Sequence, residues 1–113
     1  MDCIFCKIIN GDIPSTKVYE DALVYAFKDI NPEAPVHVLI VPRQHIESAA
    51  SIDVSHHSLI GHIHSVAKQI AQEAGIDKTG YRLLTNIGID GGQSVQHLHY
   101  HLLGGRRLKW PPG

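Results

Sequence analysis

The sequence predicts an α+β fold, in which a five-stranded antiparallel sheet carries one long and one short helix. Five short segments rich in Val, Ile, Leu and Tyr alternate with turn residues, as strands do. Only residues 55–74 repeat apolar side chains at three- and four-residue steps, the period of a long helix. A chain of 113 residues is too short for a second hydrophobic core, so we expect a single domain over residues 1–113.

Local signals predict each element in turn. A short helix is expected over residues 3–10, because Gly11 ends the apolar run that begins there. The long helix over residues 55–74 has Asp53 or Ser55 as its candidate cap. The five predicted strands are residues 16–20, 23–28, 36–41, 81–87 and 95–103. Short linkers between successive strands favour antiparallel pairing in a meander-like sheet, with the long helix on one face.

Composition and charge exclude several classes of partner. The net charge of −1, from 10 basic and 11 acidic residues, argues against a broad electrostatic grip on nucleic acid or membrane. The longest apolar stretch, residues 36–41, is too short to span a bilayer. The N-terminus lacks a secretory pattern, and two cysteines make no disulfide scaffold. We therefore expect a cytoplasmic protein with neither a nucleic-acid nor a membrane partner.

Three of the nine histidines alternate in the segment His97-Leu98-His99-Tyr100-His101. Alternate residues of a strand point to one face, so three imidazoles project together opposite an apolar face. One metal ion would be stretched between the outer two, whose Cα atoms lie roughly 13 Å apart on a straight strand. We expect one outer histidine to serve a metal or the scaffold, the middle one to carry the chemistry, and the other to bind substrate.

A glycine-rich turn comes directly before these histidines. Gly91 and Gly92 let backbone N–H groups approach an anion closely, and the Ser94 hydroxyl can donate to a phosphate oxygen or a leaving group. The alternative is a plain hairpin turn, and the P-loop pattern does not occur. The position of the turn, just before three histidines, favours an anion site.

Two further patterns leave alternatives open. Cys3 and Cys6 form a C-x-x-C motif, which is either a pair of plain thiols or half of a zinc site that needs two more ligands. A thioredoxin-like role is disfavoured, because no βαβ pattern surrounds the motif. The histidines of the long helix lack a convincing i, i+4 metal pair and are interpreted as solvated; they are His56, His57, His62 and His64.

On its motifs the chain resembles the histidine-triad (HIT) superfamily. The triad pattern of that superfamily, His-φ-His-φ-His-φ-φ with φ apolar, is matched in full by HLHYHLL at residues 97–103. The segments GGQSV at 91–95 and LLGGRRLKWPPG at 102–113 are similar to the Hint branch, the purine nucleoside phosphoramidases. This resemblance implies a HIT-like fold that pairs into a homodimer, in which the tail that carries Trp110 reaches the partner's active site.

The resemblance also implies a reaction, the hydrolysis of the P–N bond in purine nucleoside 5′-phosphoramidates. His99 is then the nucleophile that attacks phosphorus and forms a nucleotidyl-histidine, which water opens. His37 is implied to support the triad, Ser94 to contact the leaving amine, and no catalytic metal is needed. The donors implied for the phosphate are His101, Asn86, Ser94 and the backbone around Gln93.

Substrate and metal ligands follow from the same resemblance. Asp29 is implied to bind the ribose, while Ile30 and Phe5 line an apolar slot for the base, although both also fit a plain core. Several bacterial HIT proteins build a zinc site from C-x-x-C, a His in Pro-x-x-His and the first triad histidine. Those four positions are filled here by Cys3, Cys6, His45 and His97. A structural zinc with two Cys and two His ligands is therefore implied.

Two other functions stay open. One is a dinucleoside polyphosphate hydrolase or nucleotidyl transferase of the same superfamily. The other is a non-enzymatic adaptor that binds a nucleotide and turns over little. The WPPG ending and the GGQSV segment favour the phosphoramidase.

Overall fold

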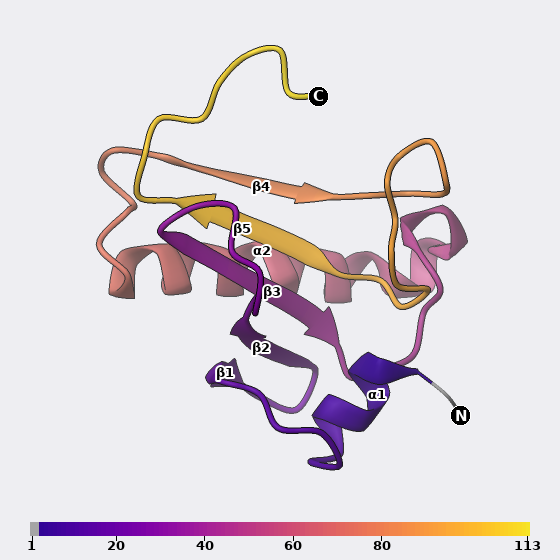
Figure 1. Cartoon of the computed structure of the whole chain (residues 1–113). Coiled ribbons are helices and arrows are strands. Elements are labelled where there is room, and N and C mark those ends of the chain that lie inside the picture. The colour runs from indigo at the N-terminus through magenta and orange to yellow at the C-terminus, as the bar shows by residue number, and fades with distance from the viewer. Residues whose placement is uncertain (1–2) are drawn as a thin grey trace.

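The computed structural model describes residues 3–113, which form five strands and two α-helices (Figure 1). Two short 3₁₀ turns, η1 and η2, come before the long helix. The helical elements are α1 (Ile4–Ile9), η1 (Ala49–Ser51), η2 (Val54–His56) and α2 (His57–Glu73). The strands are β1 (Lys17–Glu20), β2 (Val24–Lys28), β3 (Val36–Pro42), β4 (Tyr81–Thr85) and β5 (Tyr100–Gly104).

The five strands form one antiparallel sheet in the order β1-β2-β3-β5-β4, which confirms the α+β class. The meander-like order is wrong, because β5 lies between β3 and β4. Short turns do join β1 to β2 and β2 to β3, as expected. The connection from β3 to β4, over residues 43–80, contains α2 and is long enough to pass a strand position and leave it for β5.

The fifth strand is shorter than the predicted 95–103. It begins at Tyr100, because the backbone before it leaves the sheet and pairs elsewhere: the Leu98 N–H donates to the Ile46 carbonyl at 2.6 Å. Of the three alternating histidines only His101 therefore belongs to a strand. The other two precede it, His97 in a bend and His99 just before the strand, and both are held by contacts outside the sheet.

The long helix also starts later than residue 55. The Asp53 side chain accepts from the Ser55 N–H, and His56 Nδ1 accepts in turn from the Asp53 N–H. These two bonds form a capping box at the N-terminus of η2. The helix proper then runs over His57–Glu73. His56 is part of this cap and not simply solvated, which corrects the prediction for it.

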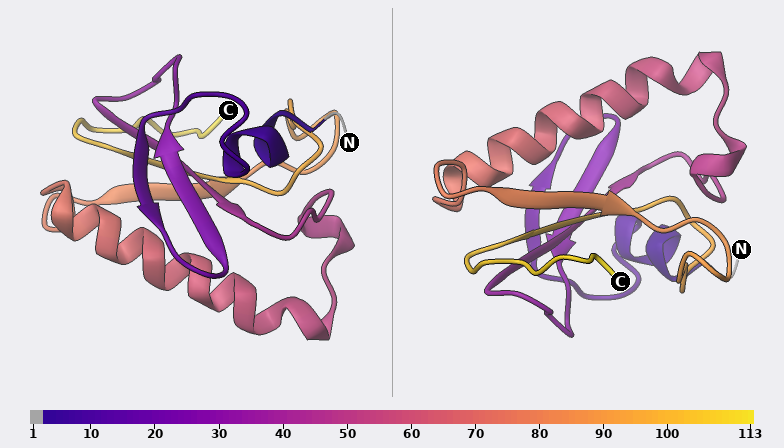
Figure 2. Two further views of the ribbon diagram at one scale, coloured as in Figure 1. Left: turned by 90° about the horizontal axis from the view of Figure 1, so that it is seen from below. Right: turned by 90° about the horizontal axis from the view of Figure 1, so that it is seen from above.

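The sheet has two different faces (Figure 2). Helix α2 covers one of them and buries the main core, which includes Val24, Ile40, Ile63, Leu98 and Leu102. On the opposite face α1 packs Phe5 and Ile8 against Phe27, Leu39 and Val41. Because Leu98, Tyr100 and Leu102 point into the α2 core, His99 and His101 between them face the side that carries α1, where Phe5 of α1 also contacts His97.

Helix α1 is too short to be stable alone. Its N-terminus is capped by the thiol of Cys3, whose Sγ accepts from the Cys6 N–H at 3.4 Å. Packing of its apolar side chains on the sheet supplies the rest of its stability. Among residues 3–113, neither helix is long and apolar enough to cross a membrane.

One histidine of α2 joins the helix to the first hairpin. His62 Nε2 donates to Asp21 Oδ2 at 2.6 Å, and the Tyr19 hydroxyl donates to the same oxygen at 2.7 Å. The other carboxylate oxygen accepts from the Leu23 and Val24 N–H groups. Burial alone would raise the pKa of Asp21, but these hydrogen bonds hold it well below its ordinary value. The prediction that His62 is solvated is therefore wrong.

Candidate functional site

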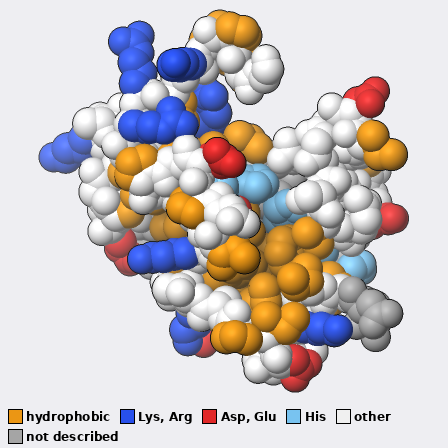
Figure 3. Space-filling model, in the orientation of Figure 1, with side chains coloured by type: hydrophobic (Ala, Val, Ile, Leu, Met, Phe, Trp, Pro, Cys, Tyr) orange, Lys and Arg blue, Asp and Glu red, His pale blue; other side chains and the backbone are white. Residues whose placement is uncertain are grey.

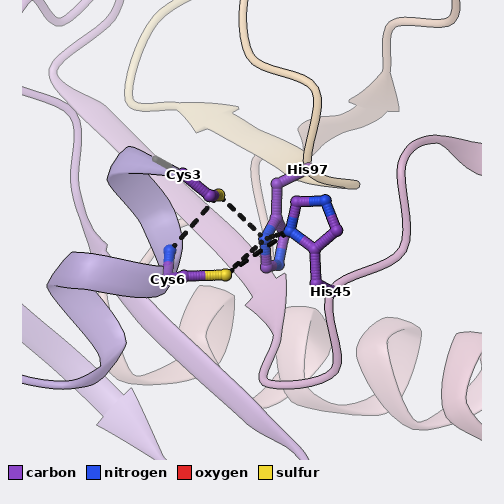
Figure 4. Close-up of side chains that lie close together, drawn as sticks. All are labelled: Cys3, Cys6, His45 and His97. Carbon is purple, nitrogen blue, oxygen red and sulfur yellow. Dashed lines mark hydrogen bonds between the residues drawn. The ribbon is translucent and has the colours of Figure 1, made fainter. Parts of the chain in front are cut away.

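Cys3, Cys6, His45 and His97 converge beside the N-terminus of α1, from three separate parts of the chain (Figure 4). His97 Nδ1 lies 3.3 Å from Cys3 Sγ, 3.6 Å from Cys6 Sγ and 3.1 Å from His45 Nδ1. His45 Nδ1 is 3.4 Å from Cys6 Sγ. The four ligand atoms thus form a compact cluster, with all separations within 4.8 Å.

These separations and this donor set fit a tetrahedral zinc ion. With Zn–S bonds of about 2.3 Å and Zn–N bonds of about 2.0 Å, the edges of such a site measure roughly 3.3–3.8 Å. Two thiols and two imidazoles are the ligands that structural zinc prefers. A C-x-x-C pair on one helical turn brings both sulfurs to the same side, and Cys3 and Cys6 begin α1 in this way.

The Pro42 carbonyl prepares His97 to bind a metal. His97 is fully buried, and its Nε2–H donates to the Pro42 carbonyl at 2.8 Å, so the lone pair of the neutral ring is on Nδ1. That is the nitrogen that faces the two cysteines. Burial also lowers the pKa of His97 and so favours the neutral ring that a metal needs.

A pocket of about 250 Å³ lies beside this cluster, between α1 and the sheet. Figure 3 shows histidine side chains at the middle of this face, next to a patch of hydrophobic side chains. The apolar wall comes mainly from α1 and the sheet: Ile4, Phe5, Ile8, Ile13, Phe27, Leu39 and Val95. The polar groups at its edge are Ser15, Lys28, Asp29, Ser94, His99 and His101.

His99 presents a reactive nitrogen to this pocket. Its Nδ1–H donates to the His97 carbonyl at 2.7 Å, which leaves the lone pair of the neutral ring on Nε2. The side chain is only 3% exposed, and burial lowers its pKa. His99 is therefore a neutral imidazole at pH 7, held in the tautomer that a nucleophile requires.

His37 and His101 form a second hydrogen-bonded chain. His37 Nδ1 accepts from the Glu33 backbone N–H at 3.0 Å, so the proton of the neutral ring is on Nε2. That Nε2–H donates to His101 Nδ1 at 2.9 Å, and the Asp29 carboxylate lies 3.4 Å from it. His101 must then carry its own proton on Nε2, as a donor. Burial, with His99 and His37 nearby, lowers the pKa of His101 to about 4.

This second chain is a poorer metal site than the cysteine cluster, although ligand atoms of Asp29, His37 and His101 also lie within 4.8 Å of one another. A metal on His37 Nε2 would require its proton to move to Nδ1. That position faces the Glu33 N–H, where two donors would oppose each other. The backbone therefore favours a proton between the two histidines.

The structure brings most of the predicted substrate residues to the pocket, but not all. Phe5, Asp29, Ile30 and Ser94 line it together with His99 and His101. Trp110 is 80% exposed and is not among the lining residues. His37 lies behind His101 and acts on the pocket only through it.

Gln93 and Asn86 turn their side chains into the loop instead. Gln93 Nε2 donates to the Glu47 and Val95 carbonyls, and its Oε1 accepts from the Gly88 N–H. Asn86 Nδ2 donates to the Gly91 carbonyl at 2.7 Å. Both residues therefore shape the turn before Ser94, and neither side chain lines the pocket.

Sequence reasoning missed much of the pocket wall. The α1 residues Ile4 and Ile8 line it with Ile13 and Ser15 from the segment that follows. The i, i+4 spacing of Ile4 and Ile8 was the available signal, because it puts both on one side of a short helix. The loop residues carry no such signal, since their position depends on how α1 packs.

Comparisons with known proteins agree with this geometry. The family model described as scavenger mRNA decapping enzyme C-term binding matches residues 2–108. An uncharacterized HIT-like protein of Synechococcus elongatus is 50% identical over 112 residues, covering 99% of this chain and 97% of that protein. A 14 kDa zinc-binding protein of Zea mays is 49% identical over 112 residues, covering 97% of this chain and 87% of that protein.

Two solved structures share the fold. A HIT family hydrolase from Legionella pneumophila superposes with a TM-score of 0.98 at 47% identity, covering 99% of this chain and all of that one. A histidine triad nucleotide-binding protein from Candida albicans has a TM-score of 0.83 at 37% identity, covering 97% of this chain and 83% of that one. With the alternating histidines and the sheet that carries them, these similarities show that the chain belongs to the histidine-triad (HIT) superfamily.

Proposed function

We propose that this protein is a hydrolase that cleaves the P–N bond of purine nucleoside 5′-phosphoramidates through a covalent nucleotidyl-histidine. The observation that carries the proposal is the state of His99: its Nδ1–H is tied to the His97 carbonyl, and its Nε2 lone pair faces a pocket. The hydrolase and the nucleotide-binding protein among the related structures support the same class of activity.

The pocket offers complementary groups for a nucleoside 5′-phosphate. The Asp29 carboxylate can accept from ribose hydroxyls, since one of its oxygens takes the Asn31 N–H and the other remains directed toward the histidines. The apolar wall with Phe5 and Ile30 suits a flat purine ring. A nucleoside with its ribose on Asp29 would then extend its phosphate toward His99 and Ser94.

The chemistry takes two displacements at phosphorus. His99 Nε2 forms a bond to phosphorus while the P–N bond to the amine breaks, and the amine leaves with a proton. Water then attacks the same phosphorus, the bond to His99 breaks, and a nucleoside monophosphate is released. Over the two steps one water is consumed: its proton replaces the one that the leaving nitrogen takes up, and its oxygen stays on phosphorus. Because the nucleophile is a neutral nitrogen and His101 can donate to the phosphate, we propose that the reaction needs no catalytic metal.

Donors at the pocket can stabilise the charge on the phosphate. The chain through His37 directs the Nε2–H of His101 away from their shared hydrogen bond, where it can reach a phosphate oxygen. Ser94 is exposed at the pocket edge, and its hydroxyl is a candidate donor to the leaving nitrogen. His101 is held by its bond to His37 before substrate arrives, which is the condition for electrostatic catalysis.

We further propose that zinc binds Cys3, Cys6, His45 and His97 and has a structural role. The geometry of the four ligand atoms and the zinc-binding relative from Zea mays support this assignment. Zinc there would hold the start of α1 against the segment that carries His97. The chain's own residues on the other side of His97 would remain available for the reaction.

The resemblance to the Hint branch also supports a homodimer. Strand β4 is an edge strand of the sheet, so one side of its backbone is available to a second copy. Trp110 lies exposed in the C-terminal segment and could reach the pocket of a partner subunit. The purine nucleotide and a second copy of the chain are thus the proposed partners.

The test is turnover of adenosine 5′-(tryptamine phosphoramidate), followed by the fluorescence of the released tryptamine. We expect wild-type protein to hydrolyse it and His99→Ala to lose at least about a thousand-fold in kcat, because the nucleophile is gone. His57→Ala, a change at the exposed start of α2, is the matched control and should keep full activity.

Binding of AMP to the same proteins separates the alternatives. A wild-type protein that binds AMP but leaves the phosphoramidate intact would overturn the proposal. Cleavage of a dinucleoside polyphosphate by that protein would then favour the P–O–P hydrolase. Lack of cleavage of either substrate would favour a nucleotide-binding adaptor.

A further inference from the structure

The segment that follows β5 contacts the loop between β2 and β3, residues 29–35. Arg106 Nη2 donates to the Glu33 carbonyl at 2.7 Å, and its Nη1 donates to the Arg107 carbonyl at 3.0 Å. The guanidinium is therefore held in place by one bond to its own segment and joined to the loop by the other.

Gly105 brings the two segments together at the same point. A Cβ on Gly105 would lie 2.9 Å from Pro35 Cβ, a distance that real side chains do not tolerate. Gly105 also has a φ of +91°, which favours glycine. The close approach to Pro35 and the bond to Glu33 are independent contacts, and both restrain the same short loop.

That loop supplies the donor that sets the tautomer of His37. The Glu33 N–H donates to His37 Nδ1, while the carbonyl of the same residue accepts from Arg106. His37 in turn donates from Nε2 to His101 Nδ1. The backbone of Glu33 thus joins the bond from Arg106 to the two bonds that lead through His37 to His101 at the pocket.

We propose that Arg106, assisted by Gly105, is a positioning residue that fixes the tautomers of His37 and His101 through the Glu33 backbone. Its effect on turnover rests on the function proposed above. Its effect on the two imidazoles does not, because it follows from the hydrogen bonds alone.

The physical reason is that one proton position determines the next. If the Glu33 N–H moves away, nothing excludes a proton from His37 Nδ1, and the Asp29 carboxylate, 3.4 Å from Nε2, is the remaining group that favours the Nε2–H tautomer. The ring then becomes a mixture, and in the Nδ1–H fraction its Nε2 is an acceptor. His101 must then donate from Nδ1 and turns a lone pair, in place of an N–H, toward the pocket. A phosphate oxygen would meet an acceptor where it needs a donor, which is repulsive.

The experiment reads the tautomers directly. Two-bond proton–nitrogen NMR spectra of ¹⁵N-labelled protein, recorded near pH 7.5, report which nitrogen of each imidazole carries the proton. We expect wild-type protein to show His37 and His101 as Nε2–H tautomers. Arg106→Ala should show both rings as mixtures, with a population of Nδ1–H. Arg107→Ala is the matched control, because it removes the same charge as Arg106→Ala. Only the Arg107 backbone takes part in the contact, so this variant should match the wild type.

A second variant guards against loss of folding. Arg106→Met keeps an unbranched stem without the donor, so it should give the same mixed tautomers as Arg106→Ala. Tautomers unchanged from wild type in a folded Arg106 variant would overturn the proposal. Gly105→Ala should shift the same two rings, because it displaces Pro35 rather than removing a charge.

Kinetics of the phosphoramidate give the second readout. Arg106→Ala should lower kcat about five-fold, the effect of one lost hydrogen bond, with Arg107→Ala unchanged. If wild-type protein does not hydrolyse the phosphoramidate, the function proposed above fails while the NMR result still decides the role of Arg106. A lowered kcat with wild-type tautomers would contradict the positioning role and point to direct contact with substrate.

Discussion

The ring of Phe5 lies edge-on to the imidazole of His99, with 5.0 Å between the ring centroids. The same ring meets His97 edge-on at 5.9 Å. Phe5 therefore touches a ligand of the proposed zinc site and the candidate nucleophile at once. It belongs to α1, whose first turn carries Cys3 and Cys6, so the metal cluster and the pocket share one short helix.

Metal removal should weaken nucleotide binding for this reason. Without an ion, the two cysteines no longer hold α1, and the helix supplies Ile4, Phe5 and Ile8 to the pocket wall. We expect the Kd for AMP to rise about ten-fold or more on chelation, because burial of one such side chain is worth roughly 1.5–3 kcal/mol. Calorimetric titration with AMP before chelation, after it and after zinc is restored measures this change.

The matched control is the double variant Cys3→Ser with Cys6→Ser. It should bind AMP as weakly as the chelated protein and should not respond to chelator. By linkage, AMP should also tighten zinc binding by the same factor. An AMP affinity that is identical with and without zinc would show that α1 stays in place through its packing on the sheet alone.

Replacement of Asp21 by alanine should destabilise the protein without touching the pocket. The carboxylate accepts four hydrogen bonds, from Tyr19, Leu23, Val24 and His62. Their loss should lower the free energy of unfolding by about 2–3 kcal/mol, since a hydrogen bond to a charged group contributes more than a neutral one. Urea unfolding measures it.

Asp90→Ala, a change in the exposed glycine-rich turn, provides the comparison for Asp21→Ala and should alter stability by less than about 0.5 kcal/mol. His62→Gln should lower the free energy of unfolding by less than Asp21→Ala does, because glutamine can still donate to the Asp21 carboxylate. If His62→Gln is as damaging as Asp21→Ala, the histidine contributes by packing and not by its bond to the carboxylate.

The pH dependence of stability should carry a contribution from His101. Its pKa is about 4 in the folded protein and 6.5 ordinarily, so between these values the unfolded chain binds more protons. The free energy of unfolding should therefore fall as pH decreases from about 6.5 toward 4, by at most about 3 kcal/mol for this group. Urea unfolding as a function of pH, with His101→Gln as the variant, isolates it: the variant should show a shallower fall over this window. Parallel curves for the two proteins would rule out His101 as the source.

The Gln93 side chain should be essential to the turn before Ser94. Gln93 is almost fully buried and makes three hydrogen bonds with backbone groups of that turn and of Glu47. Gln93→Ala leaves those groups without partners, so stability should fall by about 1–3 kcal/mol, and turnover should fall with it as Ser94 shifts. Gln93→Glu keeps the acceptor for Gly88 but sets a carboxylate oxygen against the Glu47 and Val95 carbonyls, so it should destabilise the protein at least as much as Gln93→Ala. A stable, fully active Gln93→Ala would contradict this role.

The elements that could be predicted from the sequence are those set by local signals. The period of α2 and the short turns at Asp21 and in residues 29–35 are visible within a few neighbouring residues, and they gave the helix and the order β1-β2-β3. The alternation of His97, His99 and His101 likewise predicted a shared face, because it depends only on an extended backbone.

What could not be predicted depends on partners far along the chain. The late start of β5 follows from the hydrogen bond between Leu98 and Ile46. The role of His62 follows from its bond to Asp21, 41 residues away. The position of β5 inside the sheet needs the path of residues 43–80. The motif predicts only that the backbone around Gln93 binds phosphate, and the direction of the Gln93 side chain depends on the distant Glu47 carbonyl.

The contact between Cys3 and His97 joins residues 94 positions apart. An ion at this centre would close a loop through almost the entire chain, which makes it a cross-link with a large effect on the entropy of the unfolded state. Closing a contact of such long range in the unfolded chain costs loop-closure entropy, which the rest of the fold has to offset. During synthesis the two cysteines emerge at the beginning and His97 near the end. A chain that ends before His97, or in which α1 does not lie beside His97, would therefore lack the complete set of four ligands.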